Sequence, residues 1–195
     1  MTQNAEIVVT DVRLGLVPGE RPAFPLEPVV HGARVRLGND ALEKVVRAVL
    51  TKMRDRVPAD IQVQAARFIE GGCEITAVVS KGRFMKADVR AVIGVAAQGA
   101  ERVTVAVQDV KALGMLPLDA FVAPVLERAL AMASARPGIA RSATNARALE
   151  IDPAQVVKAL GMPVRVAEGG VWIVRASSGE LEMELTAAEQ VHSLT

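Results

Sequence analysis

Side chains that could perform chemistry are few in this 195-residue chain. It contains one cysteine, Cys73, two histidines, His31 and His192, and no tyrosine. Neither histidine has a neighbouring nucleophile or a second residue at metal-ligand spacing, so both are expected on the surface. A single cysteine excludes an internal disulfide and a multi-cysteine metal site, and Cys73 is expected to be a small, buried apolar residue. The sequence predicts no catalytic residue, no metal and no cofactor.

Established catalytic motifs are also lacking. The chain has no H-E-x-x-H, no G-x-x-x-x-G-K-[ST], no G-x-S-x-G and no G-x-G-x-x-G after a strand. Acidic residues scattered over turns more often solvate a surface than form an acid–base pair. A protein without enzymatic activity is therefore the main prediction, and an enzyme with a dispersed acid–base site is a third hypothesis.

Two clusters of basic residues could contact phosphate groups. They are Lys81, Arg83, Lys86 and Arg90 in one cluster, and Arg136, Arg141 and Arg147 in the other. Lys81, Arg83 and Lys86 are the candidate contacts for a lipid headgroup, although solvated turns would have the same composition. A net charge of +1 and 3% aromatic residues do not favour nucleic-acid binding.

The apolar composition is aliphatic. Hydrophobic residues make up 51% of the chain and mean hydropathy is +0.29, so valine, alanine and leucine supply most of the expected core. The N-terminal residues do not resemble a secretory signal, and no run of 18 uncharged apolar residues occurs. These features predict a cytoplasmic protein that could contact a membrane surface transiently.

Two long helices are predicted, and they differ in character. Residues 40–55 begin with Asp40 and Glu43 as a capping pair and carry one apolar stripe. Residues 118–135 have only Asp119, Glu127 and Arg128 as charged residues. Because a helix that is apolar nearly all round must be covered on all sides, this second helix is expected to be enclosed by protein or by a hydrophobic molecule.

The remaining segments predict an antiparallel sheet. Residues 5–16 alternate as a strand, the proline-rich residues 18–28 are expected to be a poorly paired connection, and residues 61–110 predict a four-stranded meander with tight glycine turns. Gly94 could bend its long third strand. A strand near 145–151 precedes a short helix that has Asp152 as cap, Pro153 as first residue and Gly161 as terminator. Short strands follow to about residue 188.

This order of elements resembles the bacterial members of the tubular lipid-binding (TULIP) superfamily. The similarity covers about Val29 to Leu185 and depends on the step Leu116-Pro117-Leu118 into the apolar helix and on Leu149-Glu150-Ile151-Asp152, where a strand leads to a helix cap. The resemblance implies an α+β fold in which a long, strongly curved antiparallel sheet wraps around one long helix, with a second apolar helix and a short third helix. It also implies a lipid binder that performs no chemistry.

A single elongated domain is predicted over residues 1–195, with an N-terminal strand and proline-rich connection (1–28), a core (29–186) and a flexible tail (187–195). The main hypothesis is binding of a lipid or other apolar small molecule in a tunnel between helix and sheet. The tunnel-lining candidates are Leu42, Val45, Val46, Val49, Met53, Val89, Ile93, Phe121, Val125 and Met132. The alternative is an interaction module, a homodimer with a fully packed core and no ligand.

Overall fold

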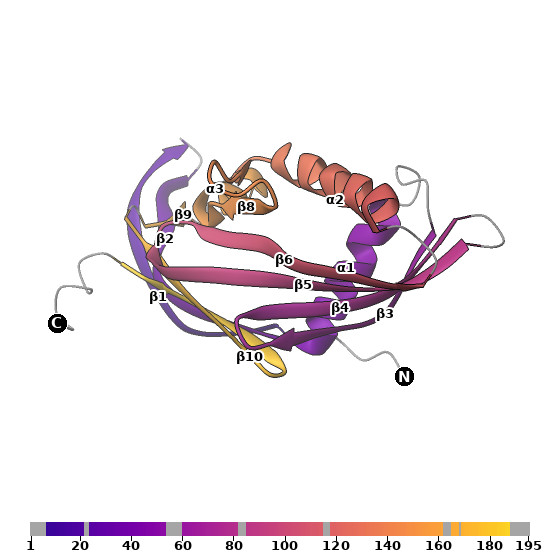
Figure 1. Cartoon of the computed structure of the whole chain (residues 1–195). Coiled ribbons are helices and arrows are strands. Elements are labelled where there is room, and N and C mark those ends of the chain that lie inside the picture. Colours follow the sequence, from indigo (N-terminus) through magenta and orange to yellow (C-terminus); the bar gives the residue numbers. More distant parts are fainter. Residues whose placement is uncertain are drawn as a thin grey trace.

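The computed structural model describes residues 7–21, 24–53, 60–81, 85–114, 118–161, 165–167 and 169–187. Over these residues the chain forms eleven strands and three helices. The strands make one strongly curved, mostly antiparallel half-barrel sheet (Figure 1). The predicted α+β class with a curved antiparallel sheet is thus confirmed, whereas the wrapping of the sheet around one long helix is not.

At one edge of the sheet, β1 (Ile7–Arg21) and β2 (Phe24–Gly38) form a long antiparallel hairpin. The other edge of β2 pairs with β11 (Glu180–Thr186), which pairs with β10 (Val171–Ser177). The two-residue strand β9 (Arg165–Val166) runs parallel to β2 and makes the one parallel pair among the described strands. Strands from both ends of the sequence therefore lie side by side.

The prediction that residues 18–28 form a poorly paired connection is wrong for the residues that the structure describes, 18–21 and 24–28. Pro18 lies opposite Leu26 in the β1–β2 hairpin, and Pro28 lies opposite Leu16. Proline is tolerated at sheet edges and next to irregularities, because the missing N–H is not needed there. Pro18 is on the edge strand β1, beside a register shift between Pro18 and Arg21, and Pro28 lies in residues 24–28 of β2, which pair with β1 but not with β11 or β9.

The centre of the sheet is the predicted four-stranded meander, which is confirmed. Its strands are β3 (Asp60–Ile69), β4 (Gly72–Lys81), β5 (Met85–Ala100) and β6 (Val103–Gly114), each paired antiparallel to the next. One edge of β5 pairs with β6. Along its other edge, residues 85–94 pair with β4 and residues 97–100 pair with β10. The change of partner follows Gly94, so β5 joins the meander to the strands from the chain ends.

The first helix, α1 (Asn39–Met53), begins directly after β2 and packs against β3 and β2. Its start is fixed to β3 because the backbone N–H of Phe68 donates a hydrogen bond of 2.7 Å to Oδ1 of Asn39. The second helix, α2 (Leu118–Ser134), packs on the small strands β7 (Ile139–Arg141) and β8 (Ala148–Ile151).

The short helix α3 (Pro153–Ala159) has the predicted caps. The backbone N–H of Gln155 donates to Oδ1 of Asp152 at 3.0 Å, and Pro153 is the first helical residue. Gly161 follows the helix with φ +67°, a left-handed conformation that glycine adopts without steric cost. Local sequence signals therefore place this helix correctly.

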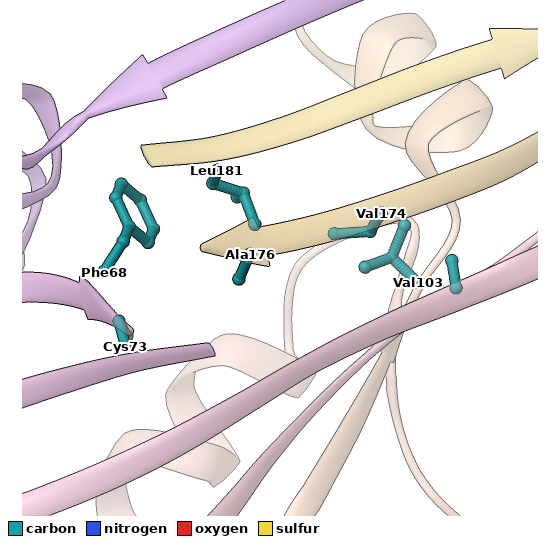
Figure 2. Close-up of a cluster of buried hydrophobic side chains, with 7 residues drawn as sticks. Phe68, Cys73, Val103, Val174, Ala176 and Leu181 are labelled. Carbon is teal, nitrogen blue, oxygen red and sulfur yellow. The ribbon is translucent and has the colours of Figure 1, made fainter. Parts of the chain in front are cut away.

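The two faces of the sheet differ in chemistry. Residues directly opposite each other on paired strands have their side chains on the same face of the sheet. The pairings of β10 with β11, of β10 with β5 and of β5 with β6 therefore place one set of aliphatic side chains on a single face. The buried core on this apolar face consists of Phe68, Cys73, Ala97, Val103, Val174, Ala176 and Leu181 (Figure 2). The other face carries ion pairs, for example between Arg36 and Glu182, whose Nε and Oε2 atoms are 2.9 Å apart.

Candidate ligand-binding site

An aliphatic strip runs along the apolar face of β5 and β6. We define this strip as Val89, Ala91, Ile93 and Val95 of β5 with Val105, Val107 and Val110 of β6. All seven residues are half-buried. At the two ends of the strip on β5, Ala87 is only 3% exposed and Ala97 only 5%. Along β5, the middle of the apolar face is therefore less covered than its ends.

Helix α2 lies on the same side of the sheet as the strip. Arg141 of β7 is opposite Leu149 of β8, and Leu149 is opposite Val105 of β6, so the three side chains share a face. The guanidinium of Arg141 donates a hydrogen bond of 3.0 Å to Oε2 of Glu127 in α2. This ion pair fixes α2 above the β7–β8 end of the apolar face.

Helix α1 begins on the same face, and the side of the helix that carries Ala41, Val45 and Val49 is covered only at its start. Ala41 is buried and Leu42 packs against the core cluster. One turn further on, Val45 is 56% exposed, and Val49 is 49% exposed. Residues four apart lie on one side of a helix, so a single apolar stripe passes from the core into solvent.

The residues predicted to line a tunnel are only partly brought together. Val89 and Ile93 lie in the aliphatic strip, and Val125 and Met132 of α2 are half-buried. On α1, Leu42 belongs to the core and Val46 is half-buried, while Val45 and Val49 face solvent. The side chains of Met53 and Phe121 lie outside the described part of the chain.

The expected enclosure of the apolar helix on all sides is not confirmed. Among the described side chains of α2, Leu130 is buried, whereas Ala123, Pro124 and Ala131 are exposed. Sequence reasoning also missed Val95, Val105 and Val107 of the strip. The alternation of valine in β5 and β6 contained the signal, but only the pairing of the two strands shows that these valines share a face.

Comparisons with known proteins give no match. No family model, no curated protein and no solved structure matches this chain.

The strongest electrostatic feature lies on the other face of the meander. Glu74 of β4 is buried between Arg67 of β3 and Arg90 of β5. Arg67 donates two hydrogen bonds to Oε1, from Nε at 3.0 Å and Nη2 at 2.6 Å, and Arg90 contacts Oε2. Burial alone would raise the pKa of Glu74, but the hydrogen bonds and charges of the two arginines outweigh it, so the pKa is lowered. A carboxylate held in its charged form by two cations is a poor general acid or base.

The predicted basic clusters are partly used in ion pairs. Arg90 is bound to Glu74, and Arg141 is bound to Glu127. Lys86, Arg136 and Arg147 are exposed. The side chain of Lys81 and all of Arg83 lie outside the described residues. The headgroup contact proposed for Lys81, Arg83 and Lys86 thus remains a prediction.

The other chemistry-bearing residues behave as the sequence predicts where they are described. Cys73 is buried in the core, and burial raises the pKa of its thiol to about 11. His31 is exposed and lies against Gly15, whereas His192 is outside the described residues. Across the described ranges, no three His, Cys, Asp or Glu residues are grouped to hold a metal ion, and no helix is long and apolar enough to cross a membrane.

Proposed function

We propose that this protein binds a lipid or another aliphatic amphiphile without performing chemistry, and that the aliphatic strip on β5 and β6 is the binding surface. The observation that carries the proposal is the burial pattern along β5. Half-buried side chains from Val89 to Val95 lie between the buried Ala87 and Ala97. Apolar area left accessible within a face that is otherwise covered provides a favourable place for an apolar guest.

The composition of the aliphatic strip indicates which class of ligand it would bind. All seven side chains are aliphatic, with no hydrogen-bond donor or acceptor and no aromatic ring. Six residue steps from Val89 to Val95 span about 20 Å at the rise of a strand. A long, flexible hydrocarbon chain matches this surface better than a compact polar molecule, because a buried polar group would lack partners. The polar end of an amphiphile would extend from the strip into water.

Trp172 offers a direct test. It is the only tryptophan of the chain, no tyrosine is present, and its side chain packs against the core cluster on the apolar face. Purified protein is titrated with a brominated or nitroxide-labelled fatty acid below its micellar concentration. If the chain binds at the strip, its quencher reaches the neighbourhood of Trp172, and fluorescence decreases with saturation. An unlabelled fatty acid should compete and restore the signal.

Two alanines on opposite faces of β5 supply a matched pair of variants. Ala91 is half-buried in the strip, whereas Ala96 is exposed on the other face. Ala91→Phe should fill the strip and weaken binding by about tenfold, the effect of losing roughly 1.4 kcal/mol. Ala96→Phe adds the same side chain where no ligand is expected and should leave binding unchanged. Equal binding by both variants, or no saturable quenching of the wild type, would refute the proposal.

A second candidate function, an interaction module, is favoured by a different surface. Most of the large hydrophobic side chains that are exposed belong to the β1–β2 hairpin rather than to the strip. Contiguous exposed apolar surface is a common mark of protein–protein contact. A packed strip that excludes fatty acid, together with stable self-association, would favour this function over ligand binding.

A further inference from the structure

The outer edge of β1 is the longest open edge of the described sheet. Along its 15 residues β1 pairs only with β2, which leaves its second row of backbone donors and acceptors unpaired within the sheet. Its apolar side chains are exposed on both faces, with Val9, opposite Val35, at 54% on one face and Leu14, opposite Val30, at 62% on the other. At the opposite end, β7 has only three residues and carries Arg141. A long apolar edge is a ready template for pairing with another strand.

The sequence of β1 is complementary to itself. Residues 7–17 read IVVTDVRLGLV, with Asp11 and Arg13 on either side of Val12. In an antiparallel pair related by a two-fold axis at Val12, each Asp11 lies opposite Arg13 of the second copy. The flanking residues then place Ile7–Thr10 opposite Leu14–Val17, so uncharged residues meet uncharged residues. Moving the axis to residue 11 or to residue 13 would bring like charges face to face, which is destabilising.

Backbone irregularity coincides with this axis. The register of β1 against β2 shifts between Thr10 and Arg13 and again between Arg13 and Leu14, and Asp11 has φ +53°. On each side of the shifts, Ile7–Thr10 and Leu14–Pro18 pair regularly with β2. A bulge normally protects a sheet edge against pairing. Here the irregularity lies at the proposed axis, so one regularly paired segment of β1 remains on each side of it.

The charged groups at the centre are accessible. Asp11 forms an ion pair with Arg34, with Oδ2 and Nη1 3.5 Å apart, and its side chain is still 66% exposed. The guanidinium of Arg13 lies over Gly32, where an added Cβ would be 2.8 Å from Nε. Because Gly32 has no side chain, the guanidinium of Arg13 lies close to the sheet surface over β2.

We propose that the protein forms a homodimer in which β1 pairs antiparallel with β1 of a second copy about Val12. The contact joins two half-barrel sheets into one continuous sheet, pairs the open backbone edge of β1 and gives its exposed side chains neighbours on a second strand. A two-fold axis gives both copies the same contacts, as closed symmetric dimers require. This inference does not depend on the ligand-binding proposal, because the β1 edge and the strip on β5 and β6 are different surfaces.

Sedimentation equilibrium of the full chain over a wide concentration range tests the dimer. Arg13→Asp places Asp11 opposite an aspartate in both symmetric contacts and should raise the dimer dissociation constant about tenfold or more, since close like charges cost more than 1 kcal/mol. The double variant Asp11→Lys with Arg13→Asp exchanges the charges and should restore the dimer. Arg147→Asp, the same charge change at an exposed residue of the β7–β8 connection, should have no effect.

Lysine at residue 11 must adopt the positive φ of Asp11, so the fold of each variant is checked by the emission of Trp172 and by thermal unfolding. If the double variant does not fold, Asp11→Asn replaces it, because asparagine tolerates this conformation and should weaken the dimer less than Arg13→Asp. A wild-type protein that is monomeric at every concentration overturns the proposal. A dimer that is insensitive to Arg13→Asp overturns the assigned axis.

Discussion

Glu74 shows how two neighbouring strands can determine the state of one side chain. Its carboxylate is buried, yet it is charged because Arg67 and Arg90 approach it from both sides. The two arginines are more than half exposed, so they bring charge to the carboxylate without being buried themselves. Glu74 therefore ties β3, β4 and β5 together on the polar face of the meander, opposite the aliphatic strip.

Replacing Glu74 by glutamine should destabilise the protein by about 1–3 kcal/mol, because one amide cannot satisfy two guanidinium groups. Urea unfolding at neutral pH measures the change. Glu43→Gln is the control, since Glu43 forms an exposed ion pair with Arg47 one turn along α1, and its replacement should cost a few tenths of a kcal/mol. Equal effects of the two substitutions would show that the arginines do not stabilise Glu74.

The same carboxylate predicts a pH dependence. The pKa of Glu74 is lower in the folded protein than its ordinary value of 4.5. Its contribution is therefore fully present above pH 4.5 and is lost as the pH falls through the lower folded value. The difference in unfolding free energy between the wild type and Glu74→Gln should be constant above this pH and shrink below it. A difference that grows on acidification would contradict the assigned sign.

At the scale of elements, the junction of β4 and β5 depends on two glycines that face each other. A Cβ added at Gly72 would lie 2.0 Å from the carbonyl oxygen of Ile93, which belongs to the backbone of the neighbouring strand. A Cβ added at Gly94 would meet the side chain of Gln108, with Nε2 2.2 Å away. Backbone in a paired strand cannot move aside, whereas the end of a flexible side chain can.

Gly72→Ala should consequently destabilise the protein by about 1–3 kcal/mol through overpacking, and Gly94→Ala by clearly less. Both changes add one methyl group to the same pair of residues, so each is the control for the other. Thermal unfolding followed by circular dichroism compares them. A larger loss for Gly94→Ala would mean that Gln108 is fixed as firmly as the backbone of β5.

At the scale of the whole molecule, the sheet is held together by contacts between distant parts of the chain. Gly38 at the end of β2 lies opposite Glu180 at the start of β11, and Val174 of β10 lies opposite Ala97 of β5. In addition, the N–H of Gly179 donates to the carbonyl of Phe68, and the N–H of Gly71 donates to that of Ala176. These two hydrogen bonds join the turn end of the β3–β4 hairpin to the turn end of the β10–β11 hairpin.

This topology predicts slow folding. Strand pairs that are far apart in the sequence must lose much chain entropy before they are stabilised, and proteins dominated by such contacts fold on the order of milliseconds to seconds. Trp172 lies on β10 next to β5, so stopped-flow fluorescence would report when the distant strands meet. Complete recovery of the Trp172 signal within microseconds would contradict the pairing of β10 with β5.

Much of the local structure follows from the sequence alone. Alternating valines and glycine turns predict the β3–β6 meander, Asp152 and Pro153 predict the start of α3, and the lack of a partner cysteine is consistent with Cys73 as a buried apolar residue. These features depend on backbone conformation and side-chain periodicity over a few residues. Such short-range preferences are readable without knowing which segments meet.

Tertiary structure decided which segments meet. Pro18 and Pro28 lie in paired strands because both positions are at a locally open edge of the described sheet, where proline is tolerated, and β5 changes its partner from β4 to β10 after Gly94. The exposure of Val45 and Val49 depends on how far α1 extends beyond the sheet, and the charge of Glu74 depends on arginines from two other strands. Each of these outcomes depends on contacts between residues that are distant in sequence. The register of each strand pair then determines which face of the sheet every side chain occupies.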